Sequence, residues 1–151
     1  MNLVTNGTFD SDMSSWPIRH SGVTWDAAYG GSCKWWDGLG TTLYLYQAIA
    51  ALVEGKRYKI SLDVVGHESP GDSRIASILL GGGDNWDGGL IQTDGHYEGY
   101  AICGSETPSI YLVGYSYHYG VSFWIDNITV ELVTARPLVG GLLAAGRRGL
   151  V

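Results

Sequence analysis

The chain has 151 residues, with 9 Lys and Arg against 15 Asp and Glu, which gives a formal net charge of −6 at pH 7. This length fits one domain with a sizeable core, and the acidic balance excludes nucleic acid as an expected partner, because phosphate binding needs a basic stripe. With 23 Gly, 6 Trp and 10 Tyr but only 2 Phe, the composition favours tight turns and aromatic side chains that carry a polar group, which suit edges and clefts.

Strand candidates follow one another along the chain with little helical periodicity between them. They occupy residues 1–5, 23–27, 42–50, 57–66, 74–82, 97–104, 109–117 and 121–133. Within 57–66, the apolar residues Ile60, Leu62 and Val64 alternate with polar ones, as in an antiparallel strand with one solvated face. Many short strands separated by Gly- and Pro-containing turns predict an all-β fold, a two-sheet antiparallel jelly-roll sandwich over residues 1–134.

The composition changes at Ala135. The segment ARPLVGGLLAAGRRGLV (135–151) has four Leu, two Val and no acidic residue, whereas disordered segments are normally poor in Leu and Val. We therefore expect an extended C-terminal arm that docks on a neighbouring subunit or a larger assembly; the alternative is an ordinary disordered terminus. The residues expected to serve this assembly arm are Arg136, Leu138, Leu142, Leu143, Arg147, Arg148 and Leu150.

Three motifs occur in order along the chain: NLVTNGTFDSDMSSW (2–16), LYQAIAALVEGKRYKISLDV (45–64) and WIDNITVEL (124–132). Together they resemble the carbohydrate-binding modules of xylanases and cellulases that share a galactose-binding-like jelly roll, and the resemblance covers about residues 1–133. It implies a structural calcium near Asp10 and Asp126, which match the family's acidic positions, although the family commonly has Glu at the first. The alternative is that Asp126 accepts hydrogen bonds from backbone N–H groups beside Asn127 and binds no metal.

Catalytic motifs are not recognisable. The sequence has no nucleophile elbow, no phosphate loop and no HExxH spacing, and Cys33 and Cys103 allow either one disulfide or two buried thiols without a zinc-like cluster. We therefore expect no enzymatic activity and no cofactor other than one structural calcium.

The aromatic residues are the remaining functional resource, because Trp and Tyr rings stack on the apolar face of a pyranose. Trp35 and Trp36 are adjacent, so on a strand they point to opposite faces. Trp86 lies in the Gly- and Asp-rich sequence GDNWDGG, where we expect an exposed indole that contacts a ligand or partner. The candidate contact residues are Trp25, Trp36, Tyr44, Tyr46, Trp86, Tyr117 and Tyr119.

Two functions fit these features. The first is an accessory structural protein of a virus particle, namely a capsid decoration (cement) protein or tail component of a tailed phage, located in the virion. It would form a homo-oligomer and bind the major capsid protein or another virion protein. The second is a carbohydrate-binding module that recognises a polysaccharide outside the cell. The sequence favours the first, because it has no recognisable secretory signal and ends in the apolar arm; no apolar run reaches the length of a membrane span.

Overall fold

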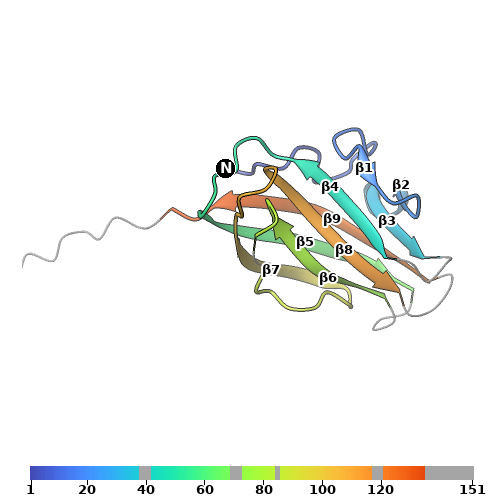
Figure 1. Cartoon of the computed structure of the whole chain (residues 1–151). Coiled ribbons are helices and arrows are strands. Elements are labelled where there is room, and N and C mark those ends of the chain that lie inside the picture. The colour runs from blue at the N-terminus through green and yellow to red at the C-terminus, as the bar shows by residue number, and fades with distance from the viewer. Residues whose placement is uncertain (38–41, 69–72, 84–85, 117–120, 135–151) are drawn as a thin grey trace, which may run out of the picture.

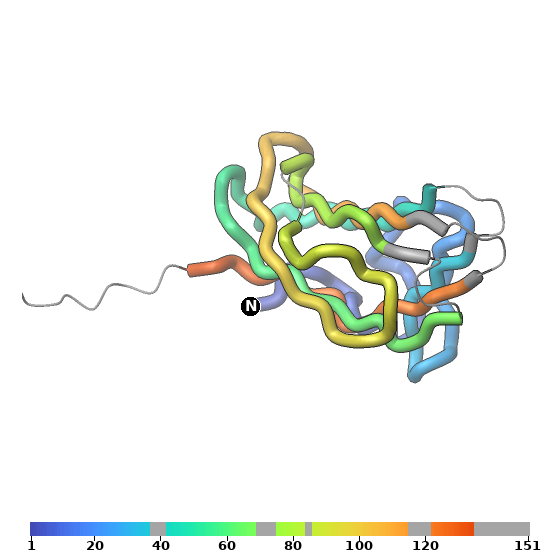
Figure 2. The backbone as a smooth tube through the Cα atoms, turned by 90° about the horizontal axis from the view of Figure 1, so that it is seen from below, coloured from blue at the N-terminus to red at the C-terminus, as the bar shows by residue number. Residues whose placement is uncertain are grey.

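The structure is a computed structural model that describes residues 1–37, 42–68, 73–83, 86–116 and 121–134. Two antiparallel sheets pack face to face (Figures 1 and 2), which confirms the predicted all-β sandwich. The four-stranded sheet has the order β1-β4-β8-β6 and the five-stranded sheet the order β2-β3-β9-β5-β7. The strands are β1 (Ile18–Arg19), β2 (Val23–Asp26), β3 (Ser32–Asp37), β4 (Leu43–Ala48), β5 (Arg57–His67), β6 (Ser73–Leu80), β7 (Gly95–Ile102), β8 (Ser109–Ser116) and β9 (Val121–Leu132).

Helical structure is confined, in the described part of the chain, to a 3₁₀ turn at Ala28–Gly30. The described residues therefore include no helix with the length and apolarity needed to cross a bilayer. The predicted assembly arm at 135–151 lies outside these residues.

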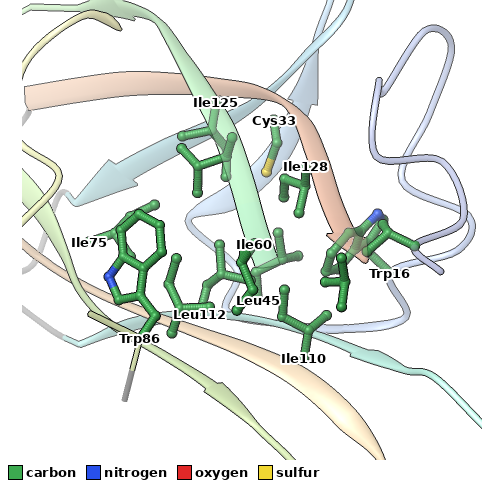
Figure 3. Packing of buried hydrophobic residues seen from close by; sticks show 14 of the residues in the cluster. Trp16, Cys33, Leu45, Ile60, Ile75, Trp86, Ile110, Leu112, Ile125 and Ile128 are labelled. Carbon is green, nitrogen blue, oxygen red and sulfur yellow. The ribbon is translucent and has the colours of Figure 1, made fainter. Parts of the chain in front are cut away.

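The core lies between the two sheets and is built by the period-two alternation of the strands. Along β5, the residues Ile60, Leu62 and Val64 are buried, as predicted, and they face Leu45 and Leu112 from the four-stranded sheet. Figure 3 shows this packing. The inward faces are thereby used for stability, which leaves the outward faces of both sheets for contacts with other molecules.

The N-terminal segment differs from the prediction of a strand at 1–5. It makes a single isolated bridge, Asn2 to Glu131, with the closing strand β9. The side-chain Oδ1 of Asn2 accepts hydrogen bonds from the N–H groups of Val4 (3.1 Å) and Val130 (2.9 Å). Because a side chain takes the place of a backbone acceptor, the ladder does not continue and the strand prediction is wrong here.

Gln47 on β4 fixes this N-terminal segment to the four-stranded sheet. Its side chain is 4% exposed. The amide Oε1 accepts a hydrogen bond from the N–H of Thr5 (2.9 Å), and Nε2 donates to the carbonyls of Thr5 (2.8 Å) and Ser15 (3.0 Å). One buried amide thus ties two parts of the N-terminal segment to β4, and the N-terminus lies at the same end of the sandwich as the end of β9 (Figure 1).

Trp86 is buried, and the expectation that its indole is exposed is wrong. The side chain is 4% exposed and packs in the core at the opposite end from Trp16 (Figure 3). Its indole Nε1 donates to the carbonyl of Gly89 (3.1 Å). A Cβ on Gly88 would lie 2.7 Å from the indole and one on Gly99 would lie 2.9 Å from it. Gly88 in this segment and Gly99 on β7 therefore provide the room for the ring.

The segment around Trp86 also covers two sheet edges. The N–H of Trp86 donates to the carbonyl of Ile78 on β6 (3.0 Å), and the N–H of Asp87 donates to the carbonyl of Tyr100 on β7 (2.9 Å). Strands β6 and β7 are the edge strands of the two sheets on this side. The segment therefore links the sheets and pairs some of their edge groups, which otherwise invite association with another strand.

Candidate functional site

Three tyrosines form a continuous aromatic surface on the outer face of the four-stranded sheet. Tyr44 and Tyr46 lie two residues apart on β4 and so share this face, and Tyr111 on β8 is the register partner of Tyr46. The ring centroids of Tyr44 and Tyr111 lie 6.2 Å apart and those of Tyr46 and Tyr111 lie 6.4 Å apart. All three side chains are half-buried. We call Tyr44, Tyr46 and Tyr111 the tyrosine strip.

The tyrosine strip is extended at both sides by other side chains. The ring of His20 meets Tyr44 edge to face, with centroids 5.9 Å apart. Leu79 on β6 is the register partner of Tyr111 on the opposite side of β8. His20 Nδ1 accepts a hydrogen bond from the N–H of Gly22 (3.0 Å), so the proton of the neutral ring is on Nε2. The aromatic surface therefore spans β4 and β8 and reaches Leu79 on β6 on one side and His20 on the other.

A pocket of about 390 Å³ opens beside the tyrosine strip. Its walls combine rings and apolar groups with a polar rim, the pattern typical of sugar and small-molecule sites. The turn that carries the rim is held against the sheet by hydrogen bonds from the N–H of Gly81 to the carbonyl of Ser109 (2.9 Å) and from the N–H of Glu106 to the carbonyl of Gly81 (3.0 Å). The pocket is lined by Tyr46, Leu79, Gly82, Glu106, Thr107, Ser109 and Tyr111.

The predicted tryptophans lie on the other sheet, away from the tyrosine strip. On β3, Trp35 is buried and Trp36 is 46% exposed, which confirms that the two indoles point to opposite faces. Trp25 on β2 is 38% exposed, and its Nε1 donates to the carbonyl of Phe9 (2.7 Å). Of the other candidate contacts, Trp86 is in the core, whereas Tyr117 and Tyr119 lie outside the described residues.

Trp124 is an aromatic residue that the sequence reasoning missed. It lies on the outer face of the five-stranded sheet yet is only 9% exposed. Tyr29 covers it edge to face at 5.7 Å, and the Nζ of Lys34 lies 5.1 Å from its ring. Its Nε1 donates to Oδ2 of Asp26 (3.2 Å). Two hydrogen bonds hold the pKa of Asp26 below its usual value. The bond from the N–H of Ala28 has the larger effect, and the bond from the Trp124 indole has the smaller one. This sheet therefore covers one of its outward-facing rings, that of Trp124, while Trp25 and Trp36 stay exposed.

Asp126 stands opposite a second carboxylate. Asp126 is on β9, and its register partner on the neighbouring strand β5 is Asp63. Like charges at directly opposed positions of two strands are unfavourable. Burial raises the pKa of Asp126, and the negative charges of Asp10 and Asp63 add to the shift, while a hydrogen bond from the Asn127 N–H (2.7 Å) opposes it. Asp63 in turn contacts Nδ1 of His96 (2.6 Å) and accepts from Nδ2 of Asn127 (2.8 Å).

Comparison with known proteins gives matches in structure alone, because no protein-family model and no curated protein matches the chain. A family 16 carbohydrate-binding module matches with a TM-score of 0.60 at 22% identity, over 85% of this chain and 99% of that one. The module TmCBM61, solved with β-1,4-galactotriose, matches with a TM-score of 0.60 at 16% identity, over 88% and 99%. The chain has the fold of a carbohydrate-binding module.

Part of a phage protein shares this fold. The enzymatically active domain of tailspike protein 4 from bacteriophage CBA120 matches with a TM-score of 0.55 at 18% identity, over 87% of this chain and 21% of that one. The structures with the carbohydrate-binding-module fold thus include a component of a phage tail.

The carbohydrate-binding-module fold brings the two predicted calcium residues close enough for the charge of Asp10 to act on Asp126. Three carboxylates, counting Asp63, give this part of the surface the charge that a cation would neutralise. Within the described ranges, however, no group of three or more His, Cys, Asp or Glu side chains is arranged to hold a metal. A calcium held by Asp10 and Asp126 would therefore take its remaining oxygen ligands from backbone carbonyls and water.

The hydrogen bond from the Asn127 N–H to Asp126 corresponds to the alternative reading of Asp126 without a metal. Asn127 has a φ of 52°, a left-handed conformation that Asn tolerates better than most residues.

The two cysteines are both buried free thiols, so the possible disulfide between Cys33 and Cys103 is not formed in the structure. Burial raises the pKa of the Cys33 thiol.

Proposed function

We propose that the protein is a non-catalytic carbohydrate-binding module that holds a glycan on the tyrosine strip. The observation that carries this proposal is the cluster of three half-buried tyrosine rings, two of which line a pocket of about 390 Å³ with a polar rim. Tyrosine rings stack on the apolar C–H faces of a pyranose, while rim groups bond to its hydroxyls. The carbohydrate-binding modules that share this fold support the proposal, in particular the one solved with galactotriose.

The test is a binding measurement by calorimetry against a panel of soluble polysaccharides and oligosaccharides. Tyr111→Ala removes the central ring of the tyrosine strip, and we expect it to weaken binding about tenfold or more, which corresponds to about 1.4 kcal/mol. Trp36→Ala is the matched control, because it removes a 46% exposed ring from the other sheet. Loss of binding in Trp36→Ala but not in Tyr111→Ala would move the site to the five-stranded sheet.

A second candidate is a structural role in a virus particle, as a capsid decoration protein or tail component of a tailed phage. The similarity to a phage tailspike domain supports it. So do three exposed apolar residues at the end of the five-stranded sheet, Ile102 (45% exposed), Leu132 (46%) and Val133 (39%). This apolar end of the sheet includes the residues just before the predicted assembly arm, and it suits a contact with a second copy or with a major capsid or other virion protein.

The two candidates are compatible, because the tyrosine strip and this apolar end use different surfaces. Sedimentation of the full chain and of a chain that ends at Thr134 tests the assembly role. We expect the full chain to be oligomeric or bound to particles and the shortened chain to be monomeric. A full chain that is monomeric and does not co-purify with particles argues against the virion role and leaves the glycan proposal in place.

A further inference from the structure

The pocket beside the tyrosine strip has a carboxylate built into its wall. Glu106 lines the pocket together with Gly82, and a Cβ on Gly82 would overlap the Glu106 carboxyl group. Gly82 has a φ of +68°, a conformation that favours glycine. The backbone N–H of Glu106 is fixed to the Gly81 carbonyl at 3.0 Å. The turn therefore fixes the backbone of Glu106 and brings its exposed carboxylate next to Gly82 at the pocket.

This carboxylate has no opposite charge at the pocket. No Lys, Arg or His is among the residues that line it, and no ion pair joins Glu106 to any residue that the structure describes. His20 on the aromatic surface contacts Tyr44, and neither residue is among those that line the pocket. The whole chain also carries a net charge of −6, which favours the approach of cations over anions.

The hydroxyl-bearing side chains of Tyr46, Thr107, Ser109 and Tyr111 also line the pocket. Ser109 Oγ donates its proton to the carbonyl of Thr107 (2.9 Å), so only its lone pairs are left for a ligand. Two tyrosine rings, Tyr46 and Tyr111, form the other wall. The hydroxyl groups suit the hydroxyls of any sugar, whereas the carboxylate and the aromatic rings favour a ligand with a positive charge, because ammonium groups bind carboxylates and aromatic faces.

We infer that the pocket recognises a sugar that carries a protonated amino group, such as a 2-amino-2-deoxy pyranose, through the Glu106 carboxylate. This inference rests on the proposed glycan-binding function of the same surface and narrows its ligand class. The tyrosine strip supplies stacking that any pyranose can use. Glu106 supplies the preference, since it attracts an ammonium group and repels a uronate or another acidic sugar.

The experiment compares three oligosaccharides of equal length and the same β-1,4 linkage by calorimetry on the full chain. They are a glucosamine oligomer at a pH at which its amines are protonated, its N-acetylated counterpart and a glucose oligomer. We expect the glucosamine oligomer to bind about tenfold more tightly than the other two, and its affinity to fall as salt screens the charges. Glu106→Gln keeps the shape of the side chain and is expected to erase this preference.

Asp94→Asn is the control, because it removes one negative charge at an exposed turn position outside the pocket and should leave the preference intact. Equal affinity for all three oligomers, or no effect of Glu106→Gln, overturns the inference; if Tyr111→Ala still weakens binding, the glycan proposal survives. Failure of every oligosaccharide in the wider panel refutes the glycan proposal itself. Circular dichroism and thermal unfolding of Glu106→Gln verify that the variant is folded.

Discussion

Replacing Trp86 with Ala tests whether this residue belongs to the core or to an exposed loop. In the structure its indole is 4% exposed and lies among core side chains (Figure 3). The substitution removes the ring and its hydrogen bond to Gly89, and it leaves a cavity next to Gly88 and Gly99 where the indole packs. The backbone hydrogen bond from Trp86 to Ile78 does not depend on the side chain, so the expected loss is one of packing.

The magnitude follows from the buried area. A Trp side chain buries about 150–250 Å², and at about 25 cal/mol per Å² this corresponds to roughly 4–6 kcal/mol as an upper bound. The methyl group of Ala recovers a small part, and measured Trp→Ala losses in cores are about 3–5 kcal/mol. For a chain of this length we expect Trp86→Ala to lower Tm by about 6–20 °C.

Urea unfolding followed by circular dichroism measures the loss, with Trp36→Ala as the matched control. Trp36 is 46% exposed, so its removal is expected to cost about 1 kcal/mol or less. Similar small losses for both variants would refute the placement of Trp86 in the core and would restore the expectation of an exposed indole. A large loss for Trp36→Ala alone would mean that the five-stranded sheet is packed differently.

Three further perturbations test the N-terminal attachment and the acidic site. Gln47→Leu leaves backbone groups of the N-terminal segment unpaired and is expected to lower the free energy of unfolding by about 2–4 kcal/mol; a loss below about 0.5 kcal/mol in urea contradicts this. If Asp10 and Asp126 hold calcium, a chelator should remove about 2–3 kcal/mol from a protein near saturation, and an unchanged Tm argues against the metal. In the chelator, Asp126→Asn keeps the acceptor for Asn127 and relieves the charges of Asp10 and Asp63, so we expect a gain of about 0.2–1 kcal/mol at neutral pH. The folded protein raises the pKa of Asp126 above its usual value of 3.8. The ionised Asp126 therefore lowers the free energy of unfolding by its full amount above the folded pKa, and this destabilisation disappears as pH falls through that pKa. A gain that persists in acid contradicts the electrostatic origin.

Strand positions and faces were predictable wherever the alternation of side chains is regular. The β5 sequence RYKISLDVVGH has one clear buried face, and LYLYQA on β4 places Tyr44 and Tyr46 together. Tyr111 carries the same signal, because the buried Ile110 and Leu112 flank it. Its place in the tyrosine strip nevertheless depends on the register between β4 and β8, which the sequence of β8 alone does not specify.

The failures share one physical cause, namely a partner from a distant part of the chain. The room for Trp86 comes partly from Gly99 on β7, and the early end of the N-terminal pairing comes from the position of the Asn2 side chain against Val130. The residues within such a segment predict a loop or a strand, but contacts with distant residues override that local preference in the folded chain.

The two outer faces differ in which side chains of the chain contact their aromatic rings. On the five-stranded sheet, Tyr29 and Lys34 cover Trp124, and Tyr29 holds a φ of 58° that is costly for a bulky residue. A Cβ at Gly66 would overlap the Tyr29 hydroxyl, so glycine leaves the space that this cover needs. On the four-stranded sheet, the tyrosine strip contacts His20 and its own members among the described rings. Trp36 and Trp25 of the five-stranded sheet stay exposed, so it is the pocket between Tyr46, Tyr111 and the Glu106 turn that favours the four-stranded sheet for the proposed glycan.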